Sequence, residues 1–118
     1  MDDAERTFLA DLFALLGPVA LRAMFGGHGL YHDGIIIGIV VDGEVYLKTD
    51  AQTQPIFAAA GGEPFVYVSR QRTVAMSYWS VPAEAMESAT EMLPWARLAH
   101  AAALRTAVRK PAARTRRK

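Results

Sequence analysis

The sequence has no cysteine among its 118 residues, which excludes disulfide bonds, thiolate metal ligands and cysteine nucleophiles. Its longest apolar run, residues 35–41, is far shorter than the ~20 residues that a membrane-spanning helix needs. The first residues are acidic, whereas a secretory signal starts with positive charge followed by an apolar core. We therefore expect a cytoplasmic protein that makes no membrane contact.

Acidic side chains are also missing from the C-terminal end. Residues 97–118 hold eight basic and no acidic side chains, a net charge of +8, whereas residues 1–96 hold five basic and twelve acidic ones, a net charge of −7. The field of such an acidic body repels DNA. Any affinity for nucleic acid should therefore lie in the C-terminal segment.

The composition, with 52% apolar and 21% charged residues, is that of one globular domain. We place this domain at residues 1–109 and expect a basic, disordered tail at 110–118, which has no apolar pattern that could pack.

In the first half of the chain, residues 2–16 have helical periodicity, and this helix, which Asp2 or Asp3 can cap, ends at Gly17-Pro18. Strand patterns follow as far as residue 49, and the pairs Asp33-Gly34 and Asp42-Gly43 are typical of two-residue hairpin turns. This half predicts an antiparallel meander. Its strand 35–41 is apolar on both faces, which favours cover on both sides, by helices or by a second subunit.

The second half predicts a second hairpin and a long helix. Asp50 can cap a short helix, and Ser88 or Thr90 can cap the long one. The predicted segments are a helix at 52–60, strands at 65–68 and 73–81, a short helix at 83–86 and a helix at 91–109. The fold class we predict is α+β, with an antiparallel sheet flanked by an N-terminal and a long C-terminal helix.

Three glycines fall within the four positions of Gly26-Gly27-His28-Gly29. Glycine weakens a strand, so this cluster indicates a bulge or a close crossing of two backbones. A phosphate-binding loop would need a helix directly after the glycines, and here a strand pattern follows. His28 and His32 would lie about 13 Å apart in an extended segment, at ~3.3 Å per residue, so we expect no metal site and no cofactor.

An ordered set of motifs resembles the TfoX (Sxy) N-terminal domain family over residues 5–105. The set comprises Arg22, Met24-Phe25-Gly26-Gly27, Gly29-Leu30-Tyr31, Gly34, Tyr46-Leu47-Lys48, Asp50, Phe57, Pro64-Phe65, Met76-Ser77-Tyr78, Pro82 and Trp95. The resemblance implies an α+β fold akin to secretion chaperones. It also implies a role like that of the family's competence regulators, which act with a second transcription regulator at promoters.

The chain shows no paired carboxylates, nucleophile–base pair or metal-ligand set, so we expect no enzymatic activity. The basic C-terminal segment is the clearest candidate for binding, in this case of nucleic acid. The candidate residues are Arg109, Lys110, Arg114, Arg116, Arg117 and Lys118. If the five of these charges in residues 110–118 each neutralise one phosphate, the slope of log K against log salt is about −4.5, and the binding has no sequence preference.

Two functions remain open. The first is a non-enzymatic regulatory or adaptor protein that resembles competence regulators, contacts a transcription regulator, and binds DNA non-specifically through its tail. The alternative is a homodimeric protein-binding module that pairs through its sheet and has no nucleic-acid role.

Overall fold

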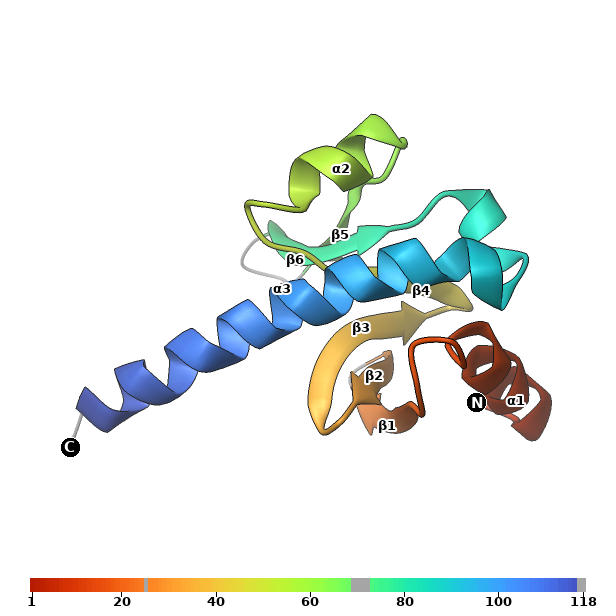
Figure 1. The fold of residues 1–118 in the computed structure, drawn as a ribbon, viewed down its shortest axis with the longest axis horizontal. Coiled ribbons are helices and arrows are strands. Elements are labelled where there is room, and N and C mark those ends of the chain that lie inside the picture. The colour runs from red at the N-terminus through yellow and green to blue at the C-terminus, as the bar shows by residue number, and fades with distance from the viewer. Residues whose placement is uncertain (25, 69–72, 117–118) are drawn as a thin grey trace.

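The computed structural model describes residues 1–118 except 25, 69–72 and 117–118. The elements in chain order are α1 (Asp3–Leu12), β1 (Ala20–Met24), β2 (Gly27–His32), β3 (Ile35–Val41), β4 (Glu44–Lys48), α2 (Gln54–Ala59), β5 (Pro64–Val68), β6 (Thr73–Ser80), the 3₁₀ helix η1 (Ala83–Met86) and α3 (Ala89–Arg116). Figure 1 shows α3 lying across the sheet and continuing well past it. The predicted α+β class, with helices at both ends of the chain, is confirmed.

The strands form one six-stranded antiparallel sheet in the order β1-β2-β3-β4-β6-β5. Both predicted hairpin turns of the meander are present. Their residues have positive φ, 53° and 77° at Asp33-Gly34 and 52° and 79° at Asp42-Gly43. Positive φ at both positions gives a turn whose twist matches that of the flanking strands. The second hairpin, β5–β6, is confirmed as well, and its predicted turn residues 70–72 lie outside the described residues.

The glycine cluster allows a close approach of two backbones. A Cβ atom on Gly27 would lie 2.2 Å from the carbonyl oxygen of Val40 in β3. The β-bulge of this region lies instead between Leu30 and Tyr31, where the register against β3 shifts. The close crossing is thus confirmed at Gly27, and the irregularity is a few residues beyond the glycines.

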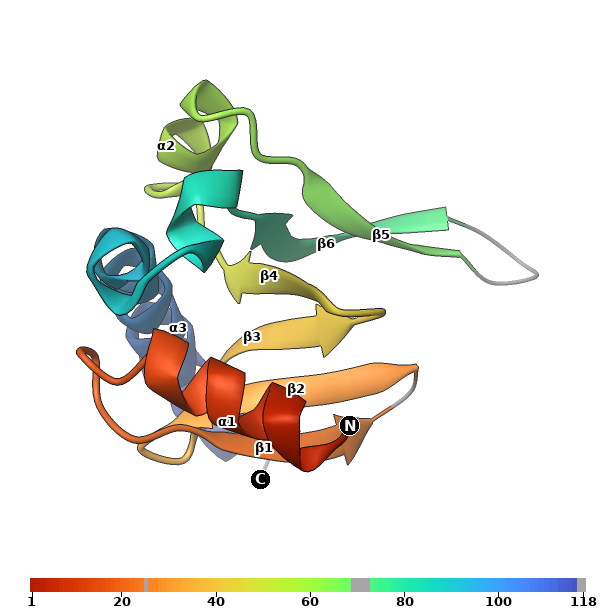
Figure 2. The same cartoon turned by 90° about the vertical axis from the view of Figure 1, so that its right-hand side faces the viewer.

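The described helices pack on the sheet face that contributes Leu30, Ile37 and Leu47 to the core, and Figure 2 shows α3 and η1 to the left of the strands and α1 in front of β1 and β2. Fully buried side chains from this face and from the helices form one core. The largest of them are Phe13, Leu30, Ile37, Leu47, Phe57 and Met92. We predicted that both faces of β3 are covered. Among the described residues, helices cover one face of β3, and no other element of the chain covers the opposite face.

Two helix ends differ from the predictions by more than two residues. The helical hydrogen bonding of α1 stops at Leu12, with Phe13 as C-cap, and turns fill the space before Gly17. At the other end, α3 continues to Arg116 rather than ending at 109. Ala112 and Ala113 favour helix. Proline disfavours a helix interior, because it removes one hydrogen-bond donor and crowds the preceding turn, yet the backbone of α3 continues through Pro111. The expected boundary at 109/110 is therefore not a break in secondary structure.

The predicted caps at the starts of α1 and α3 are present. Asp2 accepts a hydrogen bond from the backbone N–H of Glu5 at 2.8 Å, and the hydroxyl of Ser88 accepts one from Glu91 at 3.2 Å. Among the described residues, no helix combines the length and the apolar character needed to span a bilayer.

Candidate functional site

The sheet face opposite the helices carries an apolar groove of about 510 Å³. Its lining side chains come from four strands and include Met24, Ile39, Val41, Tyr67, Met76 and Tyr78. We call this surface the open sheet face. Tyr67 is 50% exposed, and Phe65 packs edge-on against Tyr46 with ring centroids 5.1 Å apart. Aromatic and methionine side chains are enriched in protein interfaces, so the open sheet face is a candidate protein-contact surface.

Charged groups surround this apolar centre. The guanidinium of Arg22 lies 4.9 Å from the ring centroid of Tyr31, and Lys48 Nζ lies 5.2 Å from that of Tyr78. Burial raises the pKa of Tyr78, and the neighbouring Tyr31 adds to this rise, so the phenol stays neutral near pH 7. Glu44 pairs in register with Val41 and therefore shares its face of the sheet. The margin thus holds both signs of charge.

A second groove, of about 750 Å³, lies where α3 leaves the sheet and passes the loop that precedes α2. Its centre is an ion pair in which Arg105 Nε donates to Asp50 Oδ2 at 2.5 Å. Asp50 Oδ1 accepts from the backbone N–H groups of Gln52 and Thr53, at 3.1 and 3.2 Å. Asp50 was predicted to cap α2. It instead caps the turn before α2, whose N-cap is Thr53.

The electrostatics of this ion pair follow from its geometry. The hydrogen bond from Arg105 lowers the pKa of Asp50, and the backbone donors at Thr53 and Gln52 lower it further. In return, the bond to Asp50 raises the pKa of Arg105. Both groups are charged at neutral pH, so the carboxylate ties the β4–α2 loop to α3.

We expect Asp50→Ala to lower the free energy of unfolding by about 1 kcal/mol through the lost backbone hydrogen bonds alone, with the lost ion pair adding to this. A carboxyl whose pKa is lowered on folding stabilises the protein above its unfolded pKa, about 3.9. That contribution disappears as the pH falls through the folded value. Urea unfolding should therefore show wild type and variant differing at pH 7 and converging below roughly pH 4.

The control for this comparison is Asp11→Ala, which removes an exposed carboxylate of α1. We expect it to change stability little at either pH. A difference between wild type and Asp50→Ala that stays constant from pH 7 to pH 3 would contradict the proposed role of the Asp50 charge.

The predicted nucleic-acid residues lie at the far end of α3. The backbone of Arg109, Lys110, Arg114 and Arg116 belongs to α3, and their side chains lie outside the described part, as do residues Arg117 and Lys118 altogether. Figure 1 shows this end of α3 projecting beyond the sheet. Leu104 and Val108, 41% and 74% exposed, mark the point where the helix leaves the body.

Sequence reasoning missed two residues of α3 that face other parts of the fold. Arg105 was counted only as one of the C-terminal cations, yet it binds Asp50 across 55 positions of the chain. His100 received no role, yet its ring lies 4.9 Å from that of His32. A distant pairing of this kind leaves no local pattern, because it depends on how α3 docks on the sheet.

Two comparisons with known proteins found similarity to this chain. A family model described as the TfoX N-terminal domain matches residues 11–103. The DNA transformation protein TfoX1 of Aliivibrio fischeri is 30% identical over 66 residues, which are 56% of this chain and 32% of that protein. The match thus spans about a third of the length of that relative.

Proposed function

Because the chain belongs to the TfoX N-terminal domain family, we propose that it is a cytoplasmic, non-enzymatic regulatory or adaptor protein related to DNA transformation. It binds DNA non-specifically through the basic end of α3 and contacts a transcription regulator. The name of its relative, a DNA transformation protein, supports the transformation role.

The projection of α3 beyond the sheet carries this proposal. Residues 97–118 have a net charge of +8 and the preceding body −7, so contact with DNA requires the cations to stand away from the body. The helix provides this separation (Figure 1). A cationic helix end neutralises phosphates and displaces counterions, without reading bases.

We expect the full chain to bind duplex DNA with a slope of log K against log salt of about −4.5, equivalent to a roughly 500-fold loss of affinity between 50 and 200 mM salt. The variant Arg114→Gln/Arg116→Gln should reduce the slope by about 1.8, because each phosphate contact contributes ~0.9. Fluorescence anisotropy with a labelled duplex measures both. Glutamine is nearly as good a helix former as arginine, so these substitutions should leave α3 helical.

The matched control is Arg6→Gln/Arg97→Gln, which removes two exposed cations from the body and from the start of the helix. It should leave the slope unchanged. Equal losses in the two double variants would contradict a site at the end of α3, and no binding at 50 mM salt would remove the nucleic-acid role.

A homodimeric protein-binding module is the second candidate, and the open sheet face favours it. An apolar centre with Arg22 and Glu44 at its margin is complementary to itself under a two-fold rotation, which can bring opposite charges together. We therefore assign a second copy of the chain as its occupant. The oligomeric state of the wild type and of variants in this groove tests this.

A further inference from the structure

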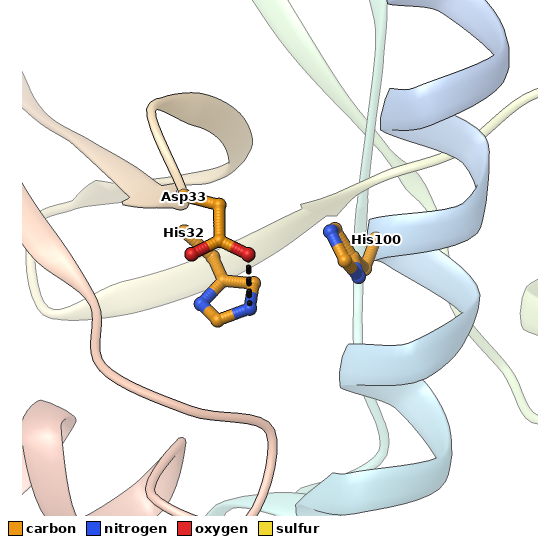
Figure 3. Close-up of side chains that lie close together, drawn as sticks. All are labelled: His32, Asp33 and His100. Carbon is orange, nitrogen blue, oxygen red and sulfur yellow. Dashed lines mark ion pairs between the residues drawn. The ribbon is translucent and has the colours of Figure 1, made fainter.

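A cluster of two histidines and an aspartate lies where the β2–β3 turn meets α3, away from both grooves described above. His32 ends β2, Asp33 begins the turn and His100 projects from α3 (Figure 3). His32 is 7% exposed, His100 is half-buried, and the side chain of Asp33 is 73% exposed. The cluster is therefore held by the fold on one side and accessible to a small ion on the other.

The structure fixes which nitrogen of His32 is available. Its Nδ1 lies 2.7 Å from the carbonyl oxygen of Pro18, and a carbonyl only accepts hydrogen bonds, so Nδ1 carries the proton. In the neutral ring the lone pair is then on Nε2, which lies 3.4 Å from Asp33 Oδ2. Both atoms can therefore donate a lone pair to one cation.

Protein contacts hold the His32 ring in place before any ion binds. A carbonyl that orients a histidine through its second nitrogen is the usual support behind a metal-bound imidazole. The ring also fills the space above Gly17, where a Cβ atom would lie 2.6 Å from His32 Cε1. A larger residue at that position would displace the ring. His32 is consequently held in one position and one tautomer.

The distances match those of a tetrahedral transition-metal site. Bonds of 2.0–2.2 Å to nitrogen and oxygen place neighbouring ligand atoms about 3.4 Å apart, which is the observed His32–Asp33 distance. All three ligand atoms lie within 4.8 Å of one another, so closing the remaining pairs takes shifts of about 1.4 Å or less to reach that geometry. The exposed Asp33 side chain has room to supply part of this movement.

The two imidazole rings are also placed for a common ion. Their centroids are 4.9 Å apart and their planes are 79° apart. Two imidazoles on one tetrahedral ion have centroids separated by about 5 Å. Imidazole and carboxylate ligands together suit Zn²⁺ and its neighbours, whereas Mg²⁺ and Ca²⁺ prefer oxygen alone.

We infer that His32, Asp33 and His100 form a binding site for one Zn²⁺ ion, with water in the fourth position, which fastens the β2–β3 turn to α3. The ion joins segments that are far apart in the chain, so it binds the folded state and not the unfolded one. The site does not depend on the proposed DNA contact, because no residue of the site belongs to the basic end of α3.

The test is a titration of EDTA-treated full-length protein with ZnCl₂, followed by calorimetry and thermal unfolding. We expect one ion per chain and a rise in Tm of roughly 10 °C at 100-fold excess over Kd. Co²⁺ used as a probe should give the visible absorption of a tetrahedral complex. Asp33→Asn keeps the positive φ of the turn accessible, and it should raise Kd at least 10-fold, as should His100→Gln.

The third histidine of the chain provides the control, because His28→Gln removes an imidazole from β2 outside the cluster. We expect it to bind Zn²⁺ as the wild type does. Absence of binding at 100-fold excess of metal over protein, or binding that His28→Gln weakens as much as Asp33→Asn does, would overturn the site. If His100→Gln unfolds, Asp33→Asn alone decides, because its side chain is exposed.

Discussion

Replacing Gly27 by alanine should lower the free energy of unfolding by about 3 kcal/mol or more, one of the two largest effects that we expect. The new Cβ atom would lie 2.2 Å from the carbonyl oxygen of Val40 and 3.2 Å from Val41 Cγ2. The first contact is with the backbone, so no side-chain rotation relieves it. The two inner strands of the meander, β2 and β3, would have to move apart at this end. Both strands contribute side chains to the core.

The neighbouring Gly26 is the matched control, because it separates the lack of space from the backbone conformation. Its φ is +71°, and a Cβ atom there meets nothing within 4 Å. Gly26→Ala should therefore cost only the left-handed penalty of about 1–2 kcal/mol. Urea unfolding of both variants measures the difference, and equal stabilities would show that the close approach at Gly27 is not what restricts this position to glycine.

The sequence predicted the parts of the fold that depend on local chemistry. Asp33-Gly34 and Asp42-Gly43 determine hairpin turns because they accept positive φ. Asp2 and Ser88 determine helix starts because their side chains satisfy free N–H groups. Together with the apolar periodicity, these signals were sufficient for the element order and for the α+β class.

The parts that could not be predicted depend on packing between distant segments. The Asp50–Arg105 and His32–His100 contacts exist because α3 crosses the sheet at one angle, which no local pattern encodes. The end of α3 was missed for another reason. A basic, alanine-containing segment favours helix by propensity, yet its charge and lack of an apolar stripe are also typical of a disordered tail.

The open sheet face links the two proposed functions. A sheet in so small a domain normally buries one face under helices and leaves a polar face in water. Here the second face has a groove lined by aromatic, methionine and branched side chains. Because exposed apolar patches of this kind mark interaction sites, we expect a second copy to cover it.

A charge placed in this groove should separate the copies, which is the second of the two largest expected effects. Tyr67→Asp puts a carboxylate on the apolar lining, where it would lose its hydration on pairing. We expect the dimer Kd to rise at least 100-fold, as for loss of an interface hot spot. Because Tyr67 is 50% exposed in the single chain, we expect the change to leave the fold itself intact.

Val68→Asp is the matched control, since it adds the same charge at the next position of β5, on the opposite face of the strand. Val68 is 68% exposed and should tolerate the change without affecting association. Sedimentation equilibrium should then give twice 12.9 kDa for the wild type and Val68→Asp, and the monomer mass for Tyr67→Asp. A monomeric wild type would exclude the second copy as occupant.

DNA binding by the same variants separates the two functions. If the chain is a DNA-associated regulator that also dimerises, each dimer brings two basic helix ends to the duplex, and the second contact forms at high effective concentration. Tyr67→Asp should then weaken DNA binding and reduce the salt slope, although it removes no cation. If the chain is a dimeric module with no nucleic-acid role, Tyr67→Asp changes the mass alone and neither protein binds DNA. Dimerisation together with DNA affinity that Tyr67→Asp leaves unchanged would mean that the open sheet face and the end of α3 act independently.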